Sequence, residues 1–75
     1  MNQVNINDTI RDNDPRVGHR VLVIESFDGA EHVRARRVLS DGSRSGYNKK
    51  GFRISLARIH TDGKSRRTGF NLQNQ

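Results

Sequence analysis

The hydrophobic positions of the chain recur with the two-residue period of β-strands. Val4 and Ile6 share one parity near the N-terminus, and Phe52, Ile54 and Leu56 alternate with less apolar residues farther along. No helical period persists over about ten residues, the length that a short helix requires. These alternating segments are separated by Gly, Asp, Asn and Ser, so the pattern predicts short strands joined by turns.

The middle of the chain predicts a β-hairpin with one central strand. Residues 20–25 hold a β-branched run that is apolar on both faces, which is typical of a strand covered on both sides. Asp28 and Gly29 follow, and this pair readily adopts the positive φ angles of a tight turn. The returning strand is predicted over residues 32–39.

The returning strand changes parity part of the way along. Val33 and Ala35 face one way, but Val38 falls on the opposite parity after the pair Arg36 and Arg37. A β-bulge at this arginine pair would turn all three apolar side chains inward. We therefore predict a bulge at Arg36 and Arg37.

The remaining segments complete an all-β domain. An Asx-rich turn is predicted over residues 12–16, where Pro15 fixes its own φ, and later strands are predicted over residues 52–57 and 68–72. The prediction is a small, strongly bent sheet of five antiparallel strands, closed into a barrel because closure hides the strand edges. Residues 1–75 form a single domain, with an ordered part over 4–72 and a frayed tail over 73–75.

Two stretches of sequence carry a resemblance to a known family. The turn that holds Asp12, Asp14, Pro15 and Arg16 before a hydrophobic strand, and the later stretch FRISLARI over residues 52–59, resemble parts of small SH3-like barrel proteins encoded by phages and bacteria. The chain is also similar in outline to KOW-type modules. The resemblance implies an SH3-like barrel with a short 3₁₀ turn near residues 57–60. It also implies a partner among RNA, DNA and proteins of the transcription or translation machinery.

Composition limits the core and the cellular setting. Only 31% of the 75 residues are hydrophobic and none is cysteine, so one thin core forms without disulfide or thiolate-metal support. The longest apolar run, residues 21–24, is too short to span a membrane, and the N-terminus lacks the features of a secretory signal. We expect a cytoplasmic protein without a membrane partner, in the host cytoplasm if a phage encodes it.

Charge is distributed unevenly along the chain. Residues 1–32 hold three basic and six acidic side chains, whereas residues 33–75 hold eleven basic and two acidic ones. Such segregation indicates a protein that binds polyanions. Arginine provides 11 of the 14 cations, and its guanidinium group holds phosphate through two hydrogen bonds.

The cations of the second half define a candidate nucleic-acid-binding site. If the two strands that carry them pair, like charges crowd together and repel unless an anion neutralises them. Tyr47 lies among these cations and either stacks on an unpaired base or packs in its loop. Phe70 follows two arginines and is either a second stacking residue or part of the core. The predicted site consists of Arg34, Arg36, Arg37, Arg44, Tyr47, Lys49, Lys50, Arg53, Lys64, Arg66 and Arg67.

The sequence contains no recognisable motif for catalysis or metal binding. His19, His32 and His60 have no carboxylate or cysteine at ligand spacing, so neither a metal nor another cofactor is expected. The stretch that contains Gly63 and Lys64 lacks the first glycine of a phosphate-binding loop. No serine has a general base and an orienting acid at a recognisable spacing, and we expect a protein that is not an enzyme.

The sequence leaves three functions open. The first is a small basic module that binds RNA or DNA mainly through phosphates, with low sequence specificity, as a phage or mobile-element accessory protein would. With about five phosphates engaged, log affinity should fall against log salt with a slope near −4 to −5. The alternatives are a module that binds an acidic host protein of transcription, translation or defence, and a structural or oligomeric phage subunit.

Overall fold

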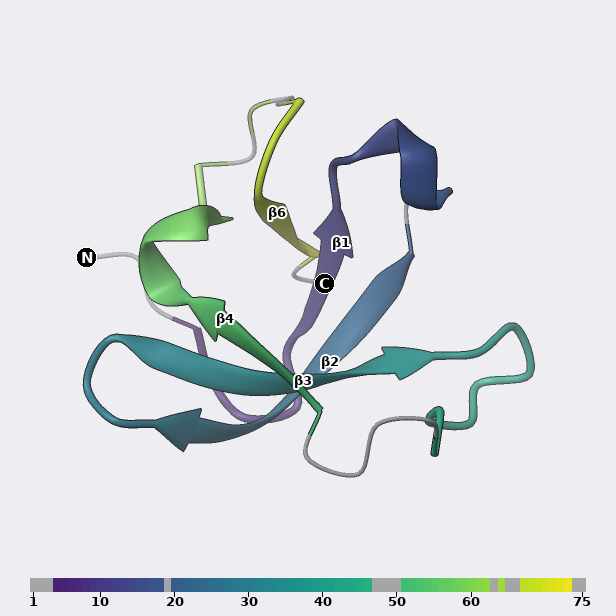
Figure 1. Ribbon diagram of the computed structural model, residues 1–75, viewed down its shortest axis with the longest axis horizontal. Coiled ribbons are helices and arrows are strands. Elements are labelled where there is room, and N and C mark those ends of the chain that lie inside the picture. The colour runs from purple at the N-terminus through teal and green to yellow at the C-terminus, as the bar shows by residue number, and fades with distance from the viewer. Residues whose placement is uncertain (1–3, 19, 47–50, 63, 65–66, 74–75) are drawn as a thin grey trace.

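The structure, a computed structural model, describes residues 4–18, 20–46, 51–62, 64 and 67–73 (Figure 1). Its elements in chain order are β1 (Thr9–Asp12), the 3₁₀ turn η1 (Pro15–Val17), β2 (Val21–Asp28), β3 (His32–Val38), β4 (Phe52–Ser55), the 3₁₀ turn η2 (Leu56–Arg58), β5 (Ile59–His60) and β6 (Phe70–Gln73).

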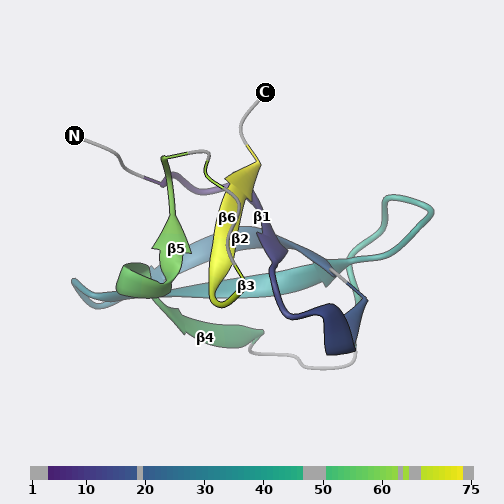
Figure 2. The same cartoon turned by 90° about the horizontal axis from the view of Figure 1, so that it is seen from above.

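The strands form a single curled sheet with the order β4-β3-β2-β1-β6-β5. Figure 1 shows β2 and β3 as a long twisted hairpin, with β1 and β6 rising steeply from it, and Figure 2 shows how the sheet curls into a half-barrel. The predicted all-β class is confirmed. The predicted count of five antiparallel strands is too low by one, because Ile59 and His60 form an additional short strand, parallel to β6.

The predicted hairpin is present, and its first strand is covered on both faces. Leu22, Val23 and Ile24 are all buried. β2 pairs antiparallel with β3, and Gly29 in the turn has a φ of 76°. An Asp-Gly turn between two β-rich runs therefore predicts the correct pairing.

The predicted position of the bulge is wrong. β3 is regular through Arg36 and Arg37, and the register shift lies in β2, between Ile24 and Ser26. Val38 therefore stays on the face opposite to Ala35, where it pairs with Val21 and is half-buried. The extra residue, Glu25, is set apart from the regular pairing, and this position matters for the arginines described below.

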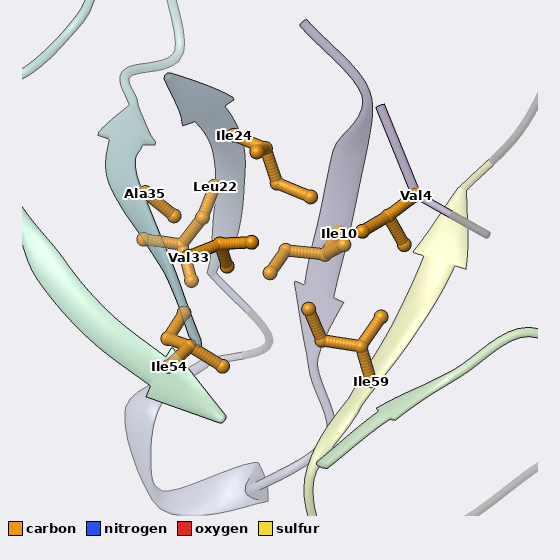
Figure 3. Packing of buried hydrophobic residues seen from close by; sticks show 8 residues of the cluster. All are labelled: Val4, Ile10, Leu22, Ile24, Val33, Ala35, Ile54 and Ile59. Carbon is orange, nitrogen blue, oxygen red and sulfur yellow. The ribbon is translucent and has the colours of Figure 1, made fainter. Parts of the chain in front are cut away.

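One hydrophobic core fills the concave side of the sheet. Figure 3 shows its side chains meeting between β2, β3 and β4 on one side and β1 and β5 on the other. Phe52, Leu56, Phe70 and Leu72 pack against this core while staying partly exposed. The buried members are Val4, Ile10, Leu22, Ile24, Val33, Ala35, Ile54 and Ile59.

Turns and strand ends differ in part from the predictions. The chain turns at Asn7, whose φ is 77°, so the first strand begins at Thr9 and not at Val4. The Asx-rich turn is confirmed: Oδ1 of Asp14 accepts a hydrogen bond from the Arg16 amide at 2.9 Å and caps η1. The second 3₁₀ turn spans Leu56–Arg58, so it begins one residue and ends two residues before the predicted range of 57–60. The predicted frayed tail does not begin at residue 73, because Gln73 belongs to β6 and pairs with Thr9 of β1. Residues 74–75 lie outside the described chain.

Candidate functional site

Two arginines on neighbouring strands share one carboxylate on the convex face of the sheet. Arg34 in β3 lies directly opposite Arg53 in β4. Oδ2 of Asp28 accepts a hydrogen bond from the Arg34 Nε at 3.0 Å and another from the Arg53 Nε at 3.2 Å. The carboxylate thus reduces the repulsion between two opposed guanidinium groups.

A second carboxylate is shared in the same way. Oε1 of Glu25, the bulged residue, lies 3.0 Å from the Arg36 Nε, and its Oε2 lies 2.9 Å from the Arg44 Nη1. The hydrogen bond from Arg36, followed by that from Arg44, lowers the pKa of Glu25 below its ordinary value. The bulge therefore supplies an anion between two cations that are eight residues apart in sequence.

We call Arg34, Arg36, Arg44 and Arg53 the arginine ladder. The sequence predicted that these cations would converge, and they do. The prediction that an external anion would be needed to neutralise them is wrong, because Asp28 and Glu25 of the same chain contact all four. Hairpin pairing places acidic β2 beside basic β3, so charges that are segregated along the sequence are interleaved in space.

Three other predicted site residues are described, and none of them joins the ladder. Arg37 pairs with Leu22, so it belongs to the opposite face of the sheet, and it is exposed at the strand end. Lys64 and Arg67 are exposed in the segment before β6. Four predicted residues lie outside the described chain: Tyr47, Lys49, Lys50 and Arg66.

A cleft of about 460 Å³ is lined by β4 and η2, by the turn after β1 and by the segment that leads into β6. Of the residues that the structure describes, five arginines and two aspartates line it, and these leave a formal excess of three positive charges. Two phenylalanines, Phe52 and Phe70, also line it, each at the start of a strand. Its lining among the described residues is Asp12, Asp14, Arg16, Arg20, Phe52, Arg53, Ile54, Ser55, Arg58, Arg67, Thr68, Gly69 and Phe70.

A buried carboxylate fixes one arginine in the cleft. Asp12, which is only 7% exposed, accepts a hydrogen bond at its Oδ2 from the Arg20 Nε at 3.1 Å. The Arg20 Cζ in turn lies 4.8 Å from the centre of the Phe52 ring, a cation–π contact. Arg20 is thus held on two sides by groups of its own chain.

The other cleft cations differ in how they are compensated. Arg16 forms an ion pair with Asp14 at 2.9 Å, and this contact lowers the pKa of Asp14 to about 2. Arg53 contacts Asp28 of the ladder. Arg58 and Arg67 are exposed, and within the described residues neither contacts a carboxylate. These two arginines carry the uncompensated charge of the cleft.

A close backbone approach brings Arg58 and Arg67 to the same cleft. Gly69 has a φ of 72°, and a Cβ built on it would lie 2.5 Å from the Arg58 carbonyl oxygen. The ring of His60 reaches the same segment, with its Nε2 3.3 Å from the Thr68 carbonyl oxygen. The segment that carries Arg67 therefore packs directly on η2.

Four residues of the cleft were not predicted from the sequence: Arg16, Arg20, Phe52 and Arg58. They come from the acidic turn, from the start of β4 and from η2, which are brought together only by the curl of the sheet. One feature of the sequence points to this cleft: Phe52 is next to Arg53, and Phe70 lies three residues after Arg67.

Comparisons with known proteins give no family for this chain. No protein-family model matches the sequence, and neither the curated proteins nor the solved structures contain a match. The similarity to SH3-like barrel proteins therefore stays a prediction. In the described part of the chain, no group of three metal-ligating side chains occurs and no helix has the length and apolarity to cross a membrane.

Proposed function

We propose that this protein binds nucleic acid through phosphate contacts, with low sequence specificity, and that the cleft is its main site. One observation carries the proposal: five arginines line the cleft against two aspartates, and Arg58 and Arg67 contact no carboxylate among the described residues. Guanidinium groups that lack an internal partner are available for two-bond contacts with phosphate oxygens.

The arginine ladder has a secondary role in this proposal. Each of its carboxylates, Asp28 and Glu25, is already engaged by two arginines. A phosphate that approaches the ladder meets these carboxylates as well, and their repulsion offsets part of the attraction. The ladder adds long-range attraction for a polyanion, whereas the cleft provides the direct contacts.

The test is the salt dependence of binding to a mixed-sequence oligonucleotide, measured by fluorescence anisotropy between about 50 and 200 mM salt. If each of the five cleft arginines neutralises one phosphate, log affinity falls against log salt with a slope of about −3.5 for a single strand and about −4.5 for a duplex. The double variant Arg58→Ala/Arg67→Ala reduces the magnitude of the slope by about 1.4 for the single strand and by about 1.8 for the duplex.

A matched control removes the same charge elsewhere. Arg11 and Arg37 are also exposed and, in the described chain, contact no carboxylate, but neither lines the cleft. Arg11→Ala/Arg37→Ala should leave most of the affinity. Equal losses in the two double variants would show that the cleft is not the site. Absence of oligonucleotide binding, with retention on polyglutamate, would favour an acidic protein as the partner.

A further inference from the structure

The cleft combines uncompensated cations with aromatic side chains. Phe52 and Phe70 pack against the core with one part and stay half-exposed with the other, and both line the cleft. The third phenylalanine, Phe27, is 49% exposed at the far end of β2 and does not line it. A contact with phosphate alone does not require aromatic walls, so these rings suggest a ligand with a flat apolar part.

One wall of the cleft is held in place before any ligand arrives. The guanidinium of Arg20 lies over the Phe52 ring, and the buried Asp12 fixes its Nε. The side chain of Arg20 is 25% exposed. Rings and guanidinium planes are the surfaces on which unpaired bases stack.

The size of the cleft suits a small planar group with attached phosphates. Its volume of about 460 Å³ lies within the range of about 300–1,000 Å³ that is common for ligand pockets. Arg58 and Arg67 are exposed among its lining residues, where the phosphates on either side of a bound nucleotide would reach them.

We propose that the cleft accommodates one unpaired base of a single-stranded nucleic acid, with the base against Phe70 and the Arg20–Phe52 pair and its flanking phosphates on Arg58 and Arg67. This inference rests on the proposed function and specifies its ligand. A base inside a duplex is stacked on its neighbours and cannot enter, so single strands are preferred over duplexes.

The experiment compares two single-stranded oligonucleotides with equal numbers of phosphates, one with bases and one with an abasic backbone. The wild-type protein should bind the strand with bases about 5- to 150-fold more tightly, the range that stacking of one base on an aromatic side chain provides. Both strands should show a similar salt slope, because they present the same phosphates. This comparison uses the wild-type protein and does not depend on the folding of a variant.

Leucine substitutions test which phenylalanine ring contacts the base. Phe70→Leu keeps an apolar side chain against the core but removes the aromatic face, so it should abolish most of the preference for the strand with bases over the abasic strand. Phe27→Leu is the matched control and should preserve the preference. In NMR spectra of the complex, nuclear Overhauser contacts should join base protons to the rings of Phe52 and Phe70, and none to Phe27.

The outcomes separate the inference from the proposed function. Equal, salt-dependent affinities for the two strands would overturn base insertion and leave phosphate binding in place. Tighter binding of a duplex than of a single strand would also overturn it. Failure to bind either strand would overturn the proposed function itself.

Discussion

Gly69 is the residue on which the geometry of the cleft depends most directly. It combines a positive φ with a backbone contact, because a Cβ there would lie 2.5 Å from the Arg58 carbonyl oxygen and 2.8 Å from the His60 Nε2. The carbonyl belongs to η2 and cannot move aside as a flexible side chain could. Gly29 has a similar φ of 76°, yet a Cβ added to it would meet no atom within 4 Å.

These two glycines give a stability prediction with its own control. Gly29→Ala should cost about 1–2 kcal/mol in the free energy of unfolding, the ordinary penalty of a left-handed conformation. Gly69→Ala should lose about 2 kcal/mol or more in addition, because the added methyl group must displace backbone. Urea unfolding of both variants measures the difference, and equal losses would contradict the close approach at Gly69.

At the scale of elements, the β2–β3 hairpin shows what the sequence can and cannot predict. The strands and the turn were predicted correctly because periodicity and the Asp-Gly signal are local properties. The bulge was predicted in the wrong strand because the break in alternation at Val38 was attributed to β3 itself. In the structure Val38 simply faces outward beside Val21, and the extra residue is Glu25 on the partner strand.

The cleft was missed for a related reason. Its lining comes from the turn after β1, from β4 and η2, and from the start of β6. Strand periodicity determines which face a residue occupies, but not which distant segments the curl of a sheet brings together. The ladder was anticipated as a cluster because Arg34, Arg36 and Arg53 lie on adjacent strands. Its carboxylates were not anticipated, since they belong to the other half of the sequence.

The bulged Glu25 predicts an acid-dependent loss of stability. Contacts with Arg36 and Arg44 lower its pKa below the ordinary value of 4.5. A carboxyl group with a lowered folded-state pKa contributes its full stabilisation above pH 4.5 and loses it as the pH falls through the folded-state value. Glu25→Gln should therefore melt at a lower temperature than the wild type near neutral pH.

Between about pH 6 and pH 3, the melting temperature of Glu25→Gln should fall less than that of the wild type, because the variant no longer has the Glu25 carboxylate to protonate. Glu31→Gln is the control, since Glu31 is exposed and its side chain has no ion-pair partner in the described part of the chain. If Glu25→Gln followed the pH dependence of the wild type, the Glu25 contacts would contribute nothing to stability.

At the scale of the whole molecule, a single core joins two halves of the curled sheet, one made of β2, β3 and β4 and the other of β1, β5 and β6 (Figure 3). β1 pairs with β2 on one side and with β6 on the other. In these two strand pairings, Ile10 lies opposite Leu22 and Leu72. Ile10 is fully buried between the two halves (Figure 3). The cleft lies between the same two halves, so its shape depends on this packing as well as on its own lining.

Ile10 therefore tests whether the domain folds as one unit. Removing its side chain in Ile10→Ala should cost about 2–5 kcal/mol, and Ile10→Val about 0.5–1.5 kcal/mol. A domain of this size rarely has more than about 3–5 kcal/mol of stability, so Ile10→Ala should be largely unfolded at room temperature, while Ile10→Val stays folded. Amide NMR dispersion distinguishes the two states. Selective loss of the signals of β5 and β6 alone would instead mean that the two halves fold separately and that the cleft can open without unfolding the hairpin.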